Sequence, residues 1–170
     1  MQQLTFEMVF YPTYSRALQS FIGLEGVFLL RCENNGDTDL RFEIATKIDG
    51  KNDPRFRSQQ KMGNDRQNNG KWYHIAIVYD GTQKGTKDAY QMYINGVKEE
   101  LTPADNSYAD VAPNTYLDLS EVKGDEALMI GRSGNSEFRL GYCNVAQARM
   151  WKTARTQEQI KEDMCKYYTP

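Results

Sequence analysis

Large apolar residues alternate with other residues in two neighbouring segments near the middle of the chain. In the segment 72–80, one face carries Tyr73, Ile75, Ile77 and Tyr79, and the other carries Trp72, His74, Ala76 and Val78. The segment 90–94 places Tyr90, Met92 and Ile94 on one face. Asp80-Gly81 follows the first segment and Asn95-Gly96 ends the second, and both dipeptides are typical of hairpin turns. A period of two between such turns predicts antiparallel strands.

The rest of the chain adds further short strands and one terminal helix. Strands are also predicted at 3–11, 17–22, 27–32, 40–47, 56–60, 127–131 and 138–151. Thr156 and Gln159 fit a capping box that opens a short amphipathic helix through Ile160. The polar stretches 48–71 and 99–124 are otherwise predicted to be long loops. The expected fold is all-β: an antiparallel jelly-roll sandwich of two sheets with a short C-terminal α-helix.

Length and charge limit the classes of function. The 170 residues fit one domain with its own core, and a formal net charge of -2 argues against nucleic acid or acidic lipid as a partner. No stretch of about 18 apolar residues occurs, so this domain is not expected to insert into a membrane. The opening MQQLTFEMVFYP lacks the features of a signal peptide and leads directly into a strand. The chain is therefore predicted to be a single domain, 1–170, excised from a longer protein.

The cysteines and the one histidine do not form a recognisable metal site. Cys32, Cys143 and Cys165 have no CxxC spacing, and His74 is the only imidazole, so a zinc site of paired Cys and His is excluded. Three buried free thiols are the favoured interpretation, with one disulfide as the alternative. His74, on a predicted strand, is interpreted as a packed or edge histidine.

Three segments in order carry a family resemblance. They are WYHIAIVYDG with YQMYINGV, then ALMIGRSG, then AQARMWKTARTQEQI. Together they resemble the core hairpin and the closing strand and helix of laminin-G-like domains, a branch of the concanavalin A-like lectin/glucanase superfamily. The segments LTFEMVF and LEGVFLLRC are similar to the versions in surface lipoproteins of glycan-foraging gut bacteria. The resemblance implies an extracellular jelly roll that recognises carbohydrate or protein, sometimes with a structural calcium ion.

Catalysis is the first activity to weigh, because the superfamily includes glucanases. Such enzymes need two carboxyl groups close together, and on a strand this takes an E-x-D-x-E type of run. No such run occurs, Glu7 stands alone in its strand, and no G-x-S-x-G motif surrounds a serine. Many relatives carry Asp-Glu in the closing strand where this chain has Ala146-Gln147. The chain is therefore predicted not to be an enzyme.

Calcium binding is the second possibility. The loop segment IDGKNDP offers Asp49, Asn52 and Asp53, whose oxygens are of the kind that Ca²⁺ prefers. Asx residues in turns also form local backbone hydrogen bonds, and this turn interpretation is favoured over a calcium site. Asp80, followed by glycine, is interpreted as a turn residue.

Sugar recognition is the third possibility. A carbohydrate site pairs aromatic rings with polar side chains that bind hydroxyl groups, and the loops hold both kinds. The predicted ligand-binding residues are Phe56, Arg57, Asn64, Tyr108 and Tyr116 of the loop segments, with Tyr93 of the sheet as a further candidate. For any single aromatic residue, a packing role is the favoured alternative. Trp72 and Trp151 fall in the matched strands and are interpreted as core residues.

The predicted function is a non-catalytic carbohydrate-binding accessory module of a secreted or surface-exposed bacterial protein. Its expected partners are a glycan or polysaccharide and a neighbouring domain of the same chain. The expected location is extracellular or at the outer-membrane surface, where a lipoprotein anchor outside this sequence would hold the protein. The alternative is a structural or protein-interaction module without a glycan ligand. A strip of exposed aromatic residues would favour sugar, whereas a flat apolar patch would favour a protein partner.

Overall fold

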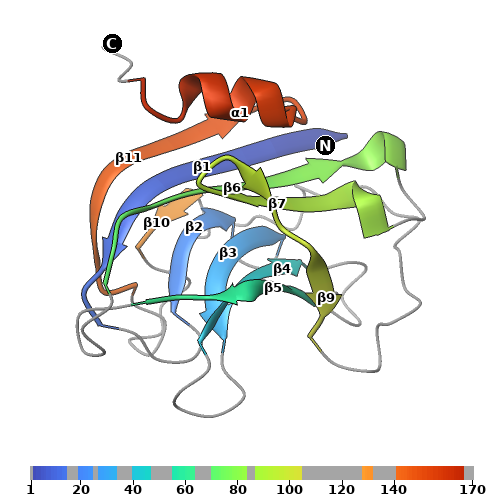
Figure 1. Cartoon of the computed structure of the whole chain (residues 1–170). Helices are drawn as coiled ribbons and strands as arrows, with labels where there is room; N and C mark the ends of the chain where they lie inside the picture. Colours follow the sequence, from blue (N-terminus) through green and yellow to red (C-terminus); the bar gives the residue numbers. More distant parts are fainter. Residues whose placement is uncertain are drawn as a thin grey trace.

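The computed structural model describes residues 2–14, 19–24, 27–33, 40–46, 55–63, 70–83, 87–104, 128–131 and 141–166. The described residues form two antiparallel sheets that pack face to face, with one short helix outside them (Figure 1). This arrangement confirms the predicted class, an antiparallel jelly-roll sandwich of two sheets with a short C-terminal helix.

The two sheets contain five and six strands. Sheet A consists, in spatial order, of β11 (Cys143–Trp151), β1 (Gln3–Pro12), β6 (Tyr73–Asp80), β7 (Tyr90–Ile94) and β8 (Val97–Lys98). Sheet B consists of β10 (Leu128–Ile130), β2 (Ser20–Leu24), β3 (Phe28–Glu33), β4 (Arg41–Thr46), β5 (Arg55–Lys61) and β9 (Leu101–Pro103). The 3₁₀ turns η2 (Gly81–Gln83) and η3 (Lys87–Ala89) lie between β6 and β7, and α1 (Gln157–Asp163) follows β11.

The inward faces of the two sheets form the main core. The predicted alternation of β6 is confirmed, since this core contains Tyr73, Ile75, Ile77 and Tyr79. Its rings pack closely: the centroids of Phe10 and Phe21 are 4.6 Å apart, and those of Phe56 and Tyr90 are 5.0 Å apart. Burial of each large apolar side chain contributes about 1.5–3 kcal/mol, so this layer is the main source of stability.

The Asn-Gly turn between β7 and β8 has the backbone that its sequence predicts. Asn95 and Gly96 both have positive φ, 51° and 77°, which suits the tight hairpin turns in which asparagine and glycine are favoured. The Gly96 carbonyl accepts a hydrogen bond from Gln157 Nε2 at 2.9 Å. A Cβ at Gly96 would lie 2.9 Å from Lys161 Cγ, so glycine here also allows α1 to approach the turn.

Helix α1 covers part of the outer face of sheet A (Figure 1). Thr156 caps the helix and forms the predicted capping box with Gln159. The buried side chain of Ile160 packs in a second apolar cluster with Ala76, Val78 and Tyr93 of the sheet. Around Ile160, sheet A is therefore apolar on both of its faces.

A buried network of charges lies under the same helix. Glu7 of β1 accepts hydrogen bonds from Arg155 Nη1 at 3.0 Å and from Arg149 Nη1 at 3.4 Å, and its Oε2 lies 3.3 Å from His74 Nε2. Arg155 also pairs with Asp163 of α1. Glu7 stands alone in its strand but has partners from other elements, as a buried carboxylate requires. The structure confirms that His74 is a packed residue of the sheet.

The cysteines are free, but only one is buried. Cys32 is buried in the core, Cys143 is partly buried and Cys165 is exposed, so the prediction of free thiols is confirmed and that of three buried ones is wrong. Burial raises the pKa of Cys32 to about 12 and that of Cys143 to about 11.

The described part of the chain contains no helix with the length and apolar character of a membrane span.

Replacement of Ile160 by alanine should undock the helix in part. We expect I160A to lower the free energy of unfolding by about 3 kcal/mol, because a fully buried side chain leaves a cavity when it is truncated. The control V97A removes methyl groups from a side chain that is 60% exposed and should change stability by less than about 0.5 kcal/mol. Urea unfolding of the three proteins measures both values, and equal stabilities would contradict this docking.

Thiol labelling should separate the three cysteines. Only the thiolate reacts with iodoacetamide, so raised pKa values keep Cys32 and Cys143 unreactive near pH 8. We expect the folded protein to be alkylated at Cys165 alone and the urea-unfolded protein at all three positions. Peptide mass spectrometry distinguishes these results, and rapid labelling of Cys32 in the folded protein would show that the core is not packed as described.

Candidate functional site

Helix α1 leaves one end of the outer face of sheet A uncovered. A helix of seven residues is about 10 Å long, whereas a strand of ten residues such as β1 extends about 33 Å. Figure 1 shows the ends of β1 and β11 bending away at the left of the view, beyond the reach of the helix. This end of the sheet is where side chains on the outer face can contact a ligand.

The uncovered end carries a strip of aromatic and amide side chains. Trp72 lies one position beyond the last paired residue of β6 and packs against Tyr11 of β1, which pairs with Asn144 of β11. Tyr142 precedes Asn144 by two residues, and its carbonyl accepts a hydrogen bond from the Tyr14 amide at 3.4 Å. We call these five residues the aromatic strip.

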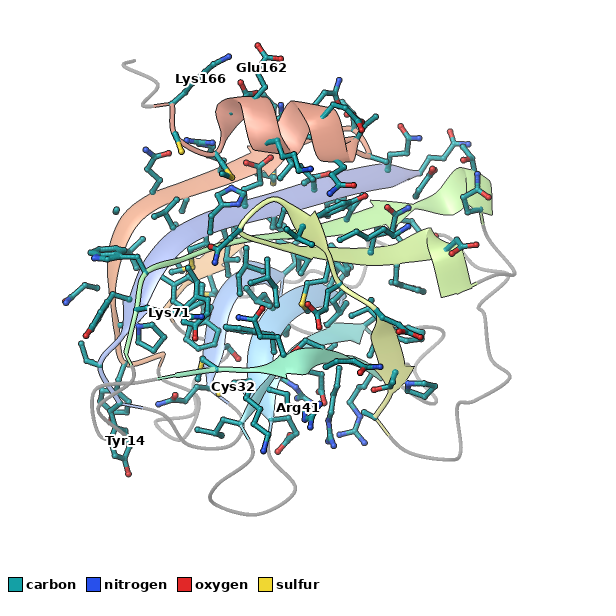
Figure 2. All side chains as sticks on the ribbon, viewed as in Figure 1. Tyr14, Cys32, Arg41, Lys71, Glu162 and Lys166 are labelled. Carbon is teal, nitrogen blue, oxygen red and sulfur yellow. The ribbon has the colours of Figure 1, made fainter. Side chains whose placement is uncertain are left out.

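The rings of the aromatic strip form two pairs. The ring centroids of Tyr11 and Trp72 are 5.7 Å apart and the rings are inclined at 56°, while Tyr14 and Tyr142 meet edge to face at 5.6 Å. Trp72 is 51% exposed, Tyr14 37% and Tyr142 42%. Among the described residues, these three are the only aromatic side chains that are exposed rather than partly or fully buried. Figure 2 shows Tyr14 and Lys71, the neighbour of Trp72, at the end of the sandwich away from α1.

This combination of groups suits a ligand with an apolar face and a polar rim. An exposed indole offers a large apolar plane, and tyrosine combines a ring with a hydroxyl group. The exposed amide of Asn144 adds a hydrogen-bond donor and an acceptor beside the rings. A sugar ring, with C–H groups on its faces and hydroxyl groups around its edge, has the complementary chemistry.

The structure corrects the interpretation of both tryptophans as core residues. Trp72 is one residue out of step with Tyr73, so the alternation that turns Tyr73 into the core turns Trp72 to the outer face. Trp151, at the end of β11, lies partly buried on the outer face, with the Arg155 guanidinium 4.1 Å from its ring centroid. The alternating pattern itself contained this signal, since it assigned Trp72 to the face opposite Tyr73.

Of the predicted ligand-binding aromatics that the structure describes, neither presents a ring face to solvent. Phe56 is 4% exposed and stacks on Tyr90, because it lies on the inward face of β5, which includes the short strand predicted at 56–60. Tyr93 is buried beneath Ile160 of α1, and its hydroxyl donates to Gln91 Oε1 at 2.6 Å. The helix that covers Tyr93 could not be placed from the strand pattern alone.

The predicted residue Arg57 belongs to a polar row on the outer face of sheet B. Arg31, Glu43, Arg57 and Thr102 are paired in register across β3, β4, β5 and β9. Arg31 Nε donates to Glu43 Oε1 at 2.7 Å, and Arg57 Nε donates to Oε2 at 2.9 Å. The Glu43 side chain is fully buried between them, so its charge is neutralised on both sides. Figure 2 shows Arg41, which shares this face, on the side of the molecule opposite α1.

The remaining predicted site residues lie outside the described residues. They are Asn64, Tyr108 and Tyr116 for the ligand and Asp49, Asn52 and Asp53 for the metal. Within the described ranges, no group of three or more His, Cys, Asp or Glu side chains is placed to hold a metal ion. The calcium site at Asp49, Asn52 and Asp53 stays a prediction.

Asp80 has the turn role that its position predicted. Its Oδ1 accepts hydrogen bonds from the Thr82 amide at 3.0 Å, the Thr82 hydroxyl at 2.7 Å and Gln3 Nε2 at 3.0 Å. Partial burial acts to raise the pKa of Asp80, but these hydrogen bonds outweigh burial and hold the pKa below its ordinary value. The carboxylate therefore fixes the chain as it leaves β6.

Replacement of Glu43 by glutamine tests the polar row. We expect E43Q to lower the free energy of unfolding by about 3 kcal/mol, because Arg31 and Arg57 would keep their charges and lose their shared counter-ion. The matched control is E162Q, whose carboxylate pairs with Lys166 on an exposed surface and should contribute less than about 1 kcal/mol. Denaturant unfolding compares the two, and an equally small effect at both positions would contradict the buried ion pairs.

Comparison with known proteins identifies the family of this fold. The chain is similar to a "putative carbohydrate binding protein" from Bacteroides ovatus ATCC 8483, with a TM-score of 0.68 and 23% identity, over 96% of this chain and 41% of that one. It is also similar to the heptameric SAP-like pentraxin from Limulus polyphemus, with a TM-score of 0.61 and 15% identity, over 94% of this chain and 68% of that one. At these identities the likeness shows the fold alone.

The chain spans less than half the length of the Bacteroides ovatus protein. No curated protein matches the chain. A family model does match, described as the concanavalin A-like lectin/glucanases superfamily, and the match covers residues 1–161. The motifs in the sequence predicted the same superfamily, and the two packed sheets agree with it. The chain therefore belongs to the concanavalin A-like lectin/glucanases superfamily.

Proposed function

We propose that this domain is a non-catalytic carbohydrate-binding module and that the aromatic strip is its binding surface. The observation that carries the proposal is the exposure of Trp72 beside Tyr11 at the uncovered end of sheet A. Exposure of a large indole ring to water is unfavourable, and Trp72 does not contribute to the core. An exposed tryptophan of this kind is typical of a recognition surface. The fold family and the description of the Bacteroides ovatus relative support sugar as the ligand class.

The described carboxylates support a binding role over catalysis. Hydrolysis of a glycosidic bond needs one carboxyl group to donate a proton and another to act as base or nucleophile. Both Glu43 oxygens contact guanidinium groups. Glu33 lies 3.8 Å from Arg31 Nη2, which also contacts Glu43 at 2.6 Å, so these two carboxylates share one guanidinium. The carboxylate oxygens of Glu43 are thus occupied by ion pairs within the sheet and do not face a second carboxylate across a cleft.

The proposal includes a place for the domain outside the cell. A module that binds polysaccharide is useful where polysaccharide occurs, at a secreted or outer-membrane surface. The Bacteroides ovatus relative is more than twice as long as the matched region, so in that protein a similar domain is joined to further chain. A lipoprotein anchor and a neighbouring domain as partners belong to the same proposal.

A second candidate function, a protein-interaction module, has a different observation in its favour. The edge strands β10 and β11 expose four apolar side chains, each 42–49% accessible: Leu128, Ile130, Val145 and Met150. The Gly141 amide donates to the Gly131 carbonyl at 2.8 Å, so the ends of these two strands lie close together. Binding of a protein with no binding of any polysaccharide would favour this alternative.

Affinity gel electrophoresis tests the proposed function. The protein is run through gels that contain laminarin, xylan, galactomannan or mucin, and we expect at least one of them to retard it. W72A should lose about tenfold or more in affinity for that polysaccharide, since it removes the largest exposed ring. No reducing ends should appear when the same polysaccharides are incubated with the protein.

The control variant V97A removes exposed apolar surface at β8, beside the Asn95-Gly96 turn. It should migrate like the parent protein in every gel. Retardation that is equal in the parent protein and W72A would place the sugar elsewhere on the molecule. Migration unaffected by every polysaccharide would contradict the proposed function, and release of reducing ends would contradict its non-catalytic part.

A further inference from the structure

The aromatic strip contains two separate ring pairs, not one. Tyr11 with Trp72 forms the first pair, and Tyr14 with Tyr142 forms the second. In the second pair the interplanar angle is 87°, so the ring that meets its partner edge-on keeps both of its faces clear of that partner. Each pair therefore includes an exposed ring that could stack on a sugar.

The register of the strands fixes how far apart the pairs lie. Tyr11 is opposite Asn144, and Tyr142 lies two residues before Asn144 on the same chain segment. Two residues of extended chain span at most about 7 Å. The Cα atoms of Tyr142 and Asn144 are thus at most about 7 Å apart, so the second pair begins next to the end of β11 that carries Asn144.

A polar group lies between the two pairs. The exposed amide of Asn144 lies between Tyr11 and Tyr142 in the register. Lys71, which precedes Trp72, is turned to the other side, with its Nζ 5.2 Å from the centroid of the buried Tyr73 ring. A ligand that covered both pairs would pass over the Asn144 amide, which can both donate and accept hydrogen bonds.

We infer that the aromatic strip has two stacking subsites and selects a chain of linked sugars over a single sugar. The inference rests on the proposed function and adds the size of the ligand. Trp72 with Tyr11 forms the main subsite, because Trp72 has the largest and most exposed ring. Tyr142 with Tyr14 forms the second, weaker subsite, and only a ligand of two or more sugar rings can occupy it together with the main subsite. Binding at both subsites without a second loss of translational freedom raises affinity.

Isothermal titration calorimetry with a ladder of oligosaccharides tests this inference. Each polysaccharide that retards the protein in gels is hydrolysed to fragments of one to six sugars, and each fragment is titrated. We expect affinity to rise at least tenfold between the single sugar and the longer fragments. W72A should weaken the binding of every fragment, whereas Y142A should weaken only the longer ones, again by about tenfold.

Two further variants make the result specific. Y14A removes the other ring of the second pair and should repeat the effect of Y142A, while V97A should leave every titration unchanged. Circular dichroism and thermal unfolding verify that each variant is folded. The inference is overturned if single sugars bind as tightly as long fragments, or if Y142A and Y14A, both folded, bind long fragments like the parent protein. Neither result contradicts the proposed function. The proposed function is contradicted only if no polysaccharide binds.

Discussion

Helix α1 is shorter than the strands on which it packs, so it covers only part of the outer face of sheet A. The helix is held by the buried side chain of Ile160 and by the ion pairs that join Arg155 to Glu7 and Asp163. These contacts fix the helix over one part of the sheet, and its seven residues end before the strands do. No other segment of the described chain packs on the rest of that face. Its side chains therefore contact solvent or a ligand.

The side chains under the helix differ in kind from those on the uncovered part of this face. Beneath the helix the sheet presents small or apolar residues, Ala76 and Val78, and charges that are fully paired. Beyond the helix it presents Trp72 and Tyr11, rings that combine apolar surface with hydrogen-bonding groups. Sheet B balances its own outer face differently, with Glu43 neutralised by two arginines across neighbouring strands. In the proposed function, the binding groups are therefore those at one end of sheet A.

Local patterns predicted most of the fold and little of the site. The period of two in β6 and the capping box at Thr156 depend on neighbours in sequence, so both could be predicted correctly. The two arginine partners of Glu7 lie 142 and 148 positions away, separations that no local pattern encodes.

The errors at individual site residues have the same origin. Phe56 lies in a strand whose polar neighbours hide the alternation, so its inward direction was not predicted. Trp72 was expected in the core because of its size and its strand, although its position in the alternation indicated the outer face. Whether an outward tryptophan is exposed depends on where the helix ends, and the length and docking of the helix are tertiary properties.

The fluorescence of Trp72 tests the central claim most directly. Replacement of Trp151 by phenylalanine keeps an aromatic ring under Arg155 and leaves Trp72 as the sole indole, since the chain has two tryptophans. With a polysaccharide that retards the protein, the account predicts that the emission of Trp72 shifts to shorter wavelength and that quenching by acrylamide decreases. Saturation with that polysaccharide while emission and quenching stay unchanged would contradict the assignment of the aromatic strip as the binding surface.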